Sequence, residues 1–235
     1  MQNGAAASRH PGRTLAPVVR TGENPPPPPA RLPGAGDIGR MLEGVLRGRA
    51  PREIAGPGRR AAVLVVLYDH VGEPHLLLTK RSEAMPSHPG QVSLPGGVID
   101  PGDRSARDAA LRETEEEVGI PRTALRVVGE LDDVGTMSSG FIIRPFVAVL
   151  QGEMRAVPSD AEVARIMDVR VHDLLTADVA LPPDPPMLSL RYPLAGEDVW
   201  GATARILRTF CQVTRFALSG PGAPTTAPAE ADPAR

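Results

Sequence analysis

The stretch that decides the fold is GGVIDPGDRSARDAALRETEEEVGI, residues 96–120. Ser105, followed three residues later by Asp108, has the form of a capping box at the start of a helix. The Gly-Ile-Pro sequence that follows Val118 supplies a stop. Few helix breakers lie between these signals, so the sequence predicts a helix over 106–118.

Four glutamates crowd into five positions of this expected helix. At about 100° per residue, Glu113, Glu116 and Glu117 fall within roughly 100° of arc, whereas Glu115 points to the far side as a bystander facing solvent. Three clustered carboxylates repel by about a kcal/mol per pair even in partly screened surroundings, and Arg112 relieves only part of this repulsion. Divalent cations relieve it fully, and oxygen-only ligands select hard ions such as Mg²⁺ or Mn²⁺.

A solvated acidic helix face is the alternative interpretation of these glutamates, because such faces are common. The preceding segment argues against it. Leu-Pro-Gly-Gly at 94–97 follows a strand-like segment, and the pair Gly96 and Gly97 permits the backbone to approach a phosphate closely. The expected position of the three glutamates is a rim beside the packed face of the helix. These features together favour a metal-assisted phosphate site.

The quoted stretch resembles the signature of the Nudix hydrolases, which reads Gly, five residues, Glu, seven residues, Arg-Glu, an apolar residue, any residue, Glu-Glu, any residue, Gly and an apolar residue. The positions that match it directly are Gly97, Arg112, Glu113, Glu116, Glu117, Gly119 and Ile120. Asp103 stands where the first Glu belongs, eight residues instead of seven separate it from Arg112, and Thr114 fills the apolar slot.

This resemblance implies an α/β (α+β) fold class, an α/β/α sandwich with a mixed central sheet, and metal-dependent hydrolysis of a diphosphate linked to another moiety. The metal ligands that it implies are Glu113, Glu116 and Glu117, with Mg²⁺ or Mn²⁺ as cofactor. It also implies catalytic roles for Arg112, which would orient a glutamate by ion pairing, and for Glu116. Glu162 is the candidate general base, and a solvated carboxylate at a helix start is its alternative.

LLTKRSEAMPSHPGQVSLPGG, residues 77–97, resembles a second signature, known from the coenzyme A branch of the same family. The matching positions are Leu77, Leu78, Thr79, Arg81, Ser82, Gly90, Pro95, Gly96 and Gly97. The longer spacing before Arg112, the Asp at 103 and VWGATARIL at 199–207 are also features of that branch. The substrate-binding residues that this resemblance implies are Arg81, Ser82, Gly96 and Gly97.

Two positions depart from the second signature, because Pro86 stands where it has Arg and Leu94 where it has Phe. A guanidinium is a natural partner for a phosphate such as the 3'-phosphate of coenzyme A, and His88 or Lys80 is a possible substitute. The first hypothesis is therefore cleavage of coenzyme A or acyl-coenzyme A to 4'-phosphopantetheine and adenosine 3',5'-bisphosphate.

The departures support a second hypothesis, in which the substrate is ADP-ribose, a dinucleotide or a nucleoside triphosphate. A third is a catalytically silent binding module on the same fold. That hypothesis predicts damage to the glutamate set, which is intact.

The rest of the chain divides into a Pro-rich tail at 1–36, a helix and linker at 37–57, the hydrolase domain at 58–218 and a second tail at 219–235. Both tails carry little apolar material and are expected to be disordered, because they cannot bury enough surface to offset the entropy of ordering. The proline run is alternatively a ligand for a proline-recognition module.

Apolar and β-branched runs predict the strands of the domain. Strands are expected at 59–69, 75–82, 125–134 and 141–150, the first two of them central. Pro145 predicts that the last of these is bent, bulged or at an edge. Residues 161–175 are helix-like and turn into a strand. A long C-terminal helix at 199–218 is expected to pack through Trp200 and Phe216, with substrate stacking as the alternative role of Trp200.

Composition sets the outer limits of the function. The 235 residues are 41% hydrophobic and 23% charged, with 26 basic against 28 acidic residues, so no basic field for nucleic acid is present. The longest apolar run is too short for a membrane helix, and the single Cys211 excludes an internal disulfide. We expect a cytoplasmic protein whose partner is a small coenzyme A-like nucleotide, without nucleic acid or membrane. The oligomeric state stays open.

Overall fold

The computed structural model of the chain describes residues 26–85, 88–136, 139–159, 162–182, 186 and 189–220. The strands are β1 (Arg59–His70), β2 (Glu73–Arg81), β3 (Val92–Ser93), β4 (Gly96–Val98), β5 (Leu125–Glu130), β6 (Val134–Gly135), β7 (Phe141–Leu150), β8 (Val163–Arg170), β9 (Arg191–Leu194) and β10 (Glu197–Trp200). The helices are α1 (Ala35–Arg47), α2 (Ala106–Val118), the 3₁₀ turn η1 (Arg122–Ala124), α3 (Val171–Val179) and α4 (Gly201–Leu218).

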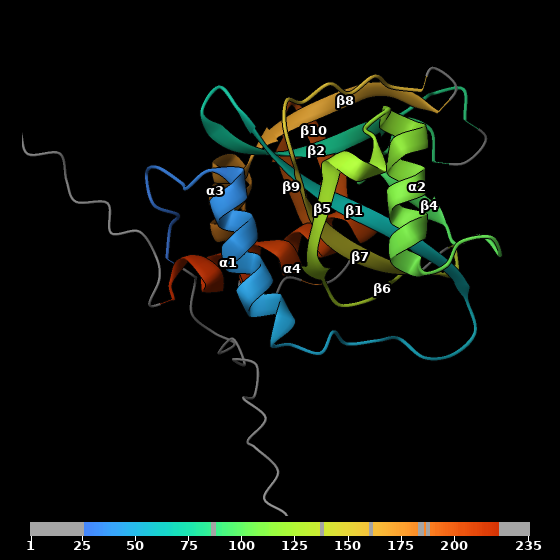
Figure 1. Cartoon of the computed structure of the whole chain (residues 1–235), viewed down its shortest axis with the longest axis horizontal. Coiled ribbons are helices and arrows are strands. Elements are labelled where there is room, and N and C mark those ends of the chain that lie inside the picture. Colours follow the sequence, from blue (N-terminus) through green and yellow to red (C-terminus); the bar gives the residue numbers. More distant parts are fainter. Residues whose placement is uncertain are drawn as a thin grey trace, which may run out of the picture.

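One mixed sheet forms the centre of the described part of the chain (Figure 1). Its main path runs β3-β2-β1-β7-β5, and β4, β6 and β8 pair with β1, β7 and β2 respectively. β1 and β7 are parallel, and the other pairs are antiparallel. The sheet lies between helices, so the predicted α+β sandwich with a mixed central sheet is confirmed.

The side chains of β1 alternate between two cores, as the pleat of a strand requires. Leu64 and Val66 lie in the core that also contains Ala110 of α2. Val65 points to the opposite face, where the core contains Phe210 of α4 together with residues of α1 and α3. α2 therefore covers one face of the sheet, and the other three helices cover the opposite face.

β1 pairs with different neighbours along its length, and this arrangement positions the glycine pair. Residues 67–70 pair with β2, whereas 61–63 pair with β4, so that Val63 lies opposite Gly96. The backbone of β1 leaves no room for a side chain at Gly96, whose φ of 141° also favours glycine. The loop that leads into α2 is thereby held against the central strand.

β7 is an inner strand, although Pro145 suggested a bend, a bulge or an edge. On one side β7 pairs with β1 along its length. On the other side β6 pairs with Ile142 and Ile143, and β5 begins its pairing at Phe146. Pro145 falls between these two partners, where its carbonyl still accepts a hydrogen bond from Leu131 N–H at 2.9 Å. The missing N–H of the proline costs the ladder nothing there.

The order of elements in 163–179 is the reverse of the prediction, because a strand precedes a helix. β8 pairs with β2 through backbone hydrogen bonds along most of its length. Its buried residues include Met167 and Val169, which alternate with exposed positions. The spacing of Val163 and Met167 by four residues gave the helical impression. Pairing with β2, which is distant in sequence, overrides that local signal.

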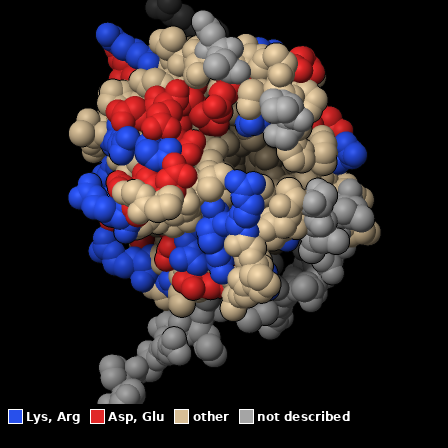
Figure 2. Space-filling model, turned by 90° about the vertical axis from the view of Figure 1, so that its right-hand side faces the viewer, with Lys and Arg blue, Asp and Glu red and all other residues tan. Residues whose placement is uncertain are grey.

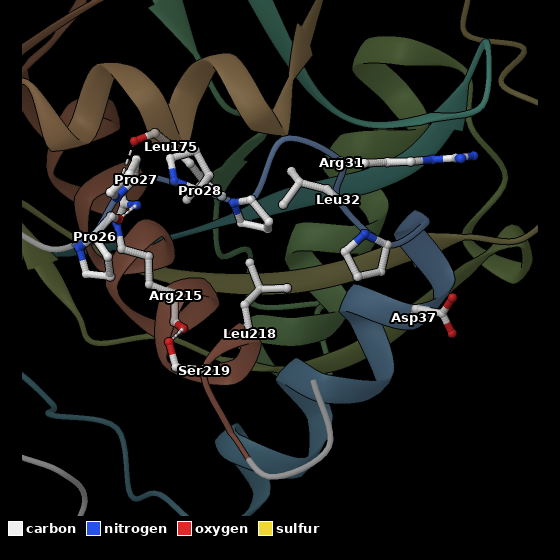
Figure 3. Close-up of a pocket in the computed structure, with 12 residues that line it drawn as sticks. Pro26, Pro27, Pro28, Arg31, Leu32, Asp37, Leu175, Arg215, Leu218 and Ser219 are labelled. Atoms are coloured by element: carbon white, nitrogen blue, oxygen red, sulfur yellow. Dashed lines mark hydrogen bonds between the residues drawn. The ribbon is translucent and has the colours of Figure 1, made fainter. Parts of the chain in front are cut away.

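The N-terminal tail was predicted to extend to residue 36, but residues 26–34 lie against α3 and α4 (Figure 3). Leu32 is buried, and Arg215 of α4 donates a hydrogen bond to the Pro26 carbonyl at 3.4 Å. The segment and the two helices enclose a cavity of about 560 Å³. Proline has a fixed φ and loses little freedom on ordering, so a few contacts suffice to hold the segment. Residues 1–25, Pro86 and 221–235 lie outside the described residues.

The C-terminal part contains a hairpin, β9 and β10, that the sequence did not predict. Trp200 ends β10 and is 43% exposed, and Phe216 on α4 is 44% exposed, so neither packs in the core as expected. Leu207 and Cys211 are buried as expected for this helix. No helix in the described part of the chain combines the length and apolar character needed to cross a bilayer.

Candidate active site

α2 carries the glutamates and has the predicted bounds. The Ser105 side chain accepts a hydrogen bond from the Asp108 N–H at 3.1 Å, which satisfies one of the free donors of the first turn. Gly119 ends the helix in the left-handed conformation with a φ of 68°. Local capping chemistry therefore fixes both ends of α2, and with them the direction in which each glutamate points.

Glu117 is the most buried of the four glutamates and is 8% exposed, so it lies deeper than the predicted rim position. Its carboxylate accepts a hydrogen bond from the Gly96 N–H at 3.1 Å. Burial raises the pKa of Glu117 to about 7, and the negative charges of Glu113 and Glu162 add to this effect. The site thus holds a carboxyl group that ionises near neutral pH.

Glu113 lies one turn earlier and faces the glycine pair. Burial raises its pKa, the charges of Glu116 and Glu162 raise it further, and Arg112 acts in the opposite direction. A Cβ atom at Gly97 would lie 2.5 Å from the Glu113 carboxyl carbon. A side chain at 97 would therefore displace the Glu113 carboxylate from its present position.

Arg112 is held by carboxylates on several sides. It donates to Asp103 through Nε at 2.9 Å and through NH2 at 3.0 Å, and NH2 also donates to the Val98 carbonyl at 3.2 Å. Its NH1 lies 2.9 Å from Glu113 and 3.0 Å from Glu116. These bonds fix the guanidinium between the loop and the helix.

Asp103 has no role in the sequence-based assignment beyond its place in the motif. The hydrogen bonds from Arg112 lower its pKa, so it is a firmly ionised partner. Its position where the signature has Glu was the signal that could have identified this role.

Glu115 points away from the other three, as predicted. It is not merely solvated, because its carboxylate pairs with the Arg122 Nε at 2.7 Å. Arg122 opens η1 beyond the end of α2, so the pair links the helix to the following turn. The four glutamates divide into a group of three and one structural residue.

Glu162 is brought to the three glutamates by the backbone of its own segment. The Ser159 N–H donates to the Glu117 carbonyl at 2.8 Å, and the Glu162 N–H donates to the Ser159 carbonyl at 3.1 Å. The Ser82 N–H donates to the Glu162 carbonyl at 2.9 Å. The Glu162 residue itself is exposed. An exposed carboxylate that is close enough to raise the pKa of Glu113 and Glu117 is well placed to act on a water molecule.

Arg81 ends β2, and Ser82 follows it into the same region. The positive charge of Arg81 acts on Glu117 and partly opposes the rise in its pKa. Ser82 is anchored to Glu162 through its N–H, and its hydroxyl accepts from the Ala84 N–H at 3.3 Å. On the side of the molecule that carries α2, acidic side chains gather at a hollow that basic side chains also border (Figure 2). The structure therefore brings together the predicted residues of β2, β4, α2 and the segment before β8.

The donor chemistry of this group fits a hard divalent cation. All of its donors are carboxylate oxygens. Burial and the proximity of like charges raise the pKa values of Glu113 and Glu117. In the part of the chain that the structure describes, no three acidic, His or Cys side chains converge as a ready coordination sphere. Two of the carboxylates, those of Glu113 and Glu116, are held in ion pairs with Arg112. The residues fit the cation by type and charge.

Comparisons with known proteins identify the family of the domain. Residues 58–190 match the family model described as "NUDIX domain". A Photorhabdus laumondii protein named "Uncharacterized Nudix hydrolase NudL" is 40% identical over 126 residues, which are 54% of this chain and 66% of that protein, just under two thirds of its length. A Yersinia pestis protein of the same name is 35% identical over 159 residues, 66% of this chain and 79% of that protein.

A solved structure of a MutT/nudix family protein from Enterococcus faecalis superposes with a TM-score of 0.48 at 16% identity. The superposition covers 74% of this chain and 68% of the other. The names of the Photorhabdus and Yersinia relatives state a hydrolase class and no substrate.

Proposed function

The chain belongs to the Nudix family of hydrolases, which act on phosphoanhydride bonds, and we propose that its substrate is coenzyme A or an acyl-coenzyme A. The products would be 4'-phosphopantetheine and adenosine 3',5'-bisphosphate. The observation that carries the hydrolase site is the group formed by Glu113, Glu117 and Glu162, whose charges act on one another beside the glycine pair. The coenzyme A assignment rests on the second signature at 77–97.

The proposed metal ligands are Glu113, Glu116 and Glu117, and the proposed cofactor is Mg²⁺ or Mn²⁺. Bound divalent cations neutralise charge on a diphosphate and lower the pKa of an attacking water. Family members generally use such ions. Arg112 then has a positioning role, because its bonds to Asp103 and Val98 fix the orientation in which Glu113 and Glu116 are presented.

The other residues of the site have proposed roles in binding and proton transfer. Glu162 is the proposed general base, because its carboxylate is exposed while its backbone is tied to Ser82 and Ser159. Arg81 is the proposed phosphate contact. Gly96 presents its N–H to Glu117, so its contribution is to hold that carboxylate in place and to keep the loop close to β1.

One of the two departures from the coenzyme A signature has a structural explanation. Leu94 is buried in the core on the α1 and α4 face of the sheet, so its exchange for Phe is a change in packing and not in a substrate contact. Lys80 is already engaged by Glu197 at 2.9 Å, which weakens its case as the substitute for the missing arginine. Pro86 remains the feature that favours ADP-ribose, a dinucleotide or a nucleoside triphosphate as the alternative substrate.

Turnover of these substrates by the purified protein, with Mg²⁺ or Mn²⁺ present, tests the proposal. We expect the highest kcat/KM on coenzyme A or its acyl derivatives. Mass analysis of the products in isotopically labelled water would report the cleaved bond and the attacked phosphorus together. Activity on coenzyme A no higher than background, with turnover of ADP-ribose or a dinucleotide, would replace the first substrate by the second. Metal-independent binding without turnover of any of them would point to a silent module.

A further inference from the structure

Trp200 is the single tryptophan of a chain in which only 3% of residues are aromatic, and it is 43% exposed. An exposed indole leaves a large apolar surface in water, so a structural reason for its position should be visible. Trp200 ends β10 and is not part of either hydrophobic core, whereas the neighbouring Val199 is fully buried. The ring is therefore available to a ligand.

An arginine of the same hairpin contacts the indole ring of Trp200. Arg191 lies directly opposite Trp200 in the β9–β10 register, and its guanidinium carbon is 5.9 Å from the centre of the indole ring. Arg191 is itself paired with Asp198, two residues before Trp200 on β10. Such a contact favours one orientation of the ring without burying it, because a cation covers only part of the aromatic surface. The indole is a preorganised flat surface.

This surface lies beside the strand that leads into the catalytic loop. β10 lies against β3, and Thr203 at the start of α4 donates a hydrogen bond to the Val92 carbonyl at 3.3 Å. A Cβ atom built at Gly201 would lie 3.8 Å from the Gln91 side-chain nitrogen. Val92 is four residues before Gly96, and at about 3.3 Å per residue that segment spans at most about 13 Å. The Gln91 carbonyl accepts a hydrogen bond from the Arg81 N–H at 2.9 Å, so the hairpin lies beside the segment that carries Arg81 into the site.

Positive charge from two neighbouring strands, β2 and β8, borders the same hairpin. Glu197 is shared by Lys80 of β2 at 2.9 Å and Arg165 of β8 at 2.8 Å, so one carboxylate faces two cations. A nucleotide that placed its base on the Trp200 ring would therefore bring its phosphates toward a region of favourable potential.

We propose that Trp200 stacks on the nucleobase of the substrate and determines recognition of the end of the molecule that does not react. The inference rests on the proposed function, since it requires a nucleoside diphosphate derivative as substrate. Every base has a flat face, so stacking alone selects for a nucleotide and against a phosphate ester that lacks a base. Trp200 is a binding residue, and the chemical step belongs to the residues around Glu117.

The chain offers a direct optical test, because its intrinsic tryptophan fluorescence comes from Trp200 alone. Adenosine 3',5'-bisphosphate is titrated into the wild-type protein, and 4'-phosphopantetheine serves as the probe without a base. We expect saturable quenching by the nucleotide and none by 4'-phosphopantetheine. Equal quenching by both probes, or by neither, would overturn the inference. This measurement does not depend on turnover, so it stands even if the proposed substrate is wrong.

Substitution supplies the second test, with Phe216→Ala as the matched control because Phe216 has nearly the same exposed fraction. Trp200→Ala should raise KM for a nucleotide substrate roughly 10- to 100-fold while kcat stays within a few fold, because stacking is a uniform binding contribution. Trp200→Phe should recover most of the affinity. An unchanged KM in Trp200→Ala, or an equal rise in Phe216→Ala, would refute the role of Trp200. Absence of turnover in the wild type would instead refute the proposed function.

Discussion

Two carboxylates are buried on opposite faces of the sheet, and their surroundings differ. Asp178 in α3 is 1% exposed and lies 2.6 Å from Arg208 and 3.2 Å from Arg215, and it also accepts a hydrogen bond from the Tyr192 hydroxyl. Glu117 in α2 is 8% exposed, and its carboxylate accepts a hydrogen bond from the Gly96 N–H. One buried acid is neutralised by its neighbours, and the other is surrounded by further acids.

The difference separates a structural role from a functional one. A buried charge that is paired and hydrogen-bonded holds its own element against the elements that supply its partners. For Asp178 of α3, the partners come from α4 and β9. A buried charge beside like charges costs free energy in the folded state, as the raised pKa of Glu117 records. This loss of stability is tolerated where the binding of a ligand offsets it, and acids with perturbed pKa values therefore cluster at functional sites.

Glu117→Gln should have the largest effect on activity. It keeps the size of the side chain and an oxygen that accepts from Gly96, but it removes the charge proposed to hold the cation. We expect kcat to fall on the order of 10³-fold, comparable with the loss of a group that stabilises developing charge. The measurement is turnover of the best substrate at saturating Mg²⁺ or Mn²⁺.

Glu115→Gln is the matched control, because it makes the same chemical change on the same helix. Its partner is Arg122, away from the other glutamates. Its kcat should stay within about twofold of the wild type, since exposed ion pairs contribute little. Equal losses of activity in both variants would contradict the division of the four glutamates.

Asp178→Asn should have the next largest effect. This effect should be on the stability of the fold and not on activity. It leaves two buried guanidinium groups without their shared counter-charge, which typically destabilises a fold by about 3–5 kcal/mol. Urea unfolding followed by circular dichroism would measure the change. The kcat of the folded fraction should remain that of the wild type. A variant as stable as the wild type would show that Asp178 does not fasten this face of the molecule.

The contrast also shows what the sequence could predict. The bounds of α2 were predictable, because Ser105 and Gly119 supply the capping signals within the segment itself. The placement of Glu113, Glu116 and Glu117 on one side of α2, away from Glu115, followed from helix geometry alone. Family resemblance then supplied the fold class and the hydrolase activity.

The depth of Glu117 and the arrival of Glu162 were not predictable in the same way. Both depend on the segment before β8, whose Ser159 N–H binds the end of α2, and on the pairing of β8 with β2. These contacts join residues far apart in the chain, and local periodicity carries no information on them. The same reason explains the reversed order of β8 and α3 and the missed β9–β10 hairpin.

The pH dependence of stability offers the sharpest comparison between wild type and Glu117→Gln. The folded-state pKa of Glu117 is raised from 4.5 to about 7, so between these values the folded chain keeps a proton that the unfolded chain releases. Stability therefore falls as pH rises through this window, and the penalty is complete above about pH 7. At 1.36 kcal/mol per pKa unit, the rise of about 2.5 units amounts to a penalty of about 3–4 kcal/mol.

Glu117→Gln lacks this titration, so it should match the wild type at pH 4.5 and exceed its free energy of unfolding by about 3–4 kcal/mol at pH 8. Urea titrations at intervals between these pH values, with a chelator present, would measure both curves. The free energy of unfolding of Glu115→Gln should follow a curve parallel to that of the wild type over the whole pH range. Parallel curves for Glu117→Gln would mean that Glu117 is as well compensated as Asp178, and the distinction between the two buried acids would then fail. Divergent curves would show that the active-site acid reduces the stability of the fold at the pH where it is ionised.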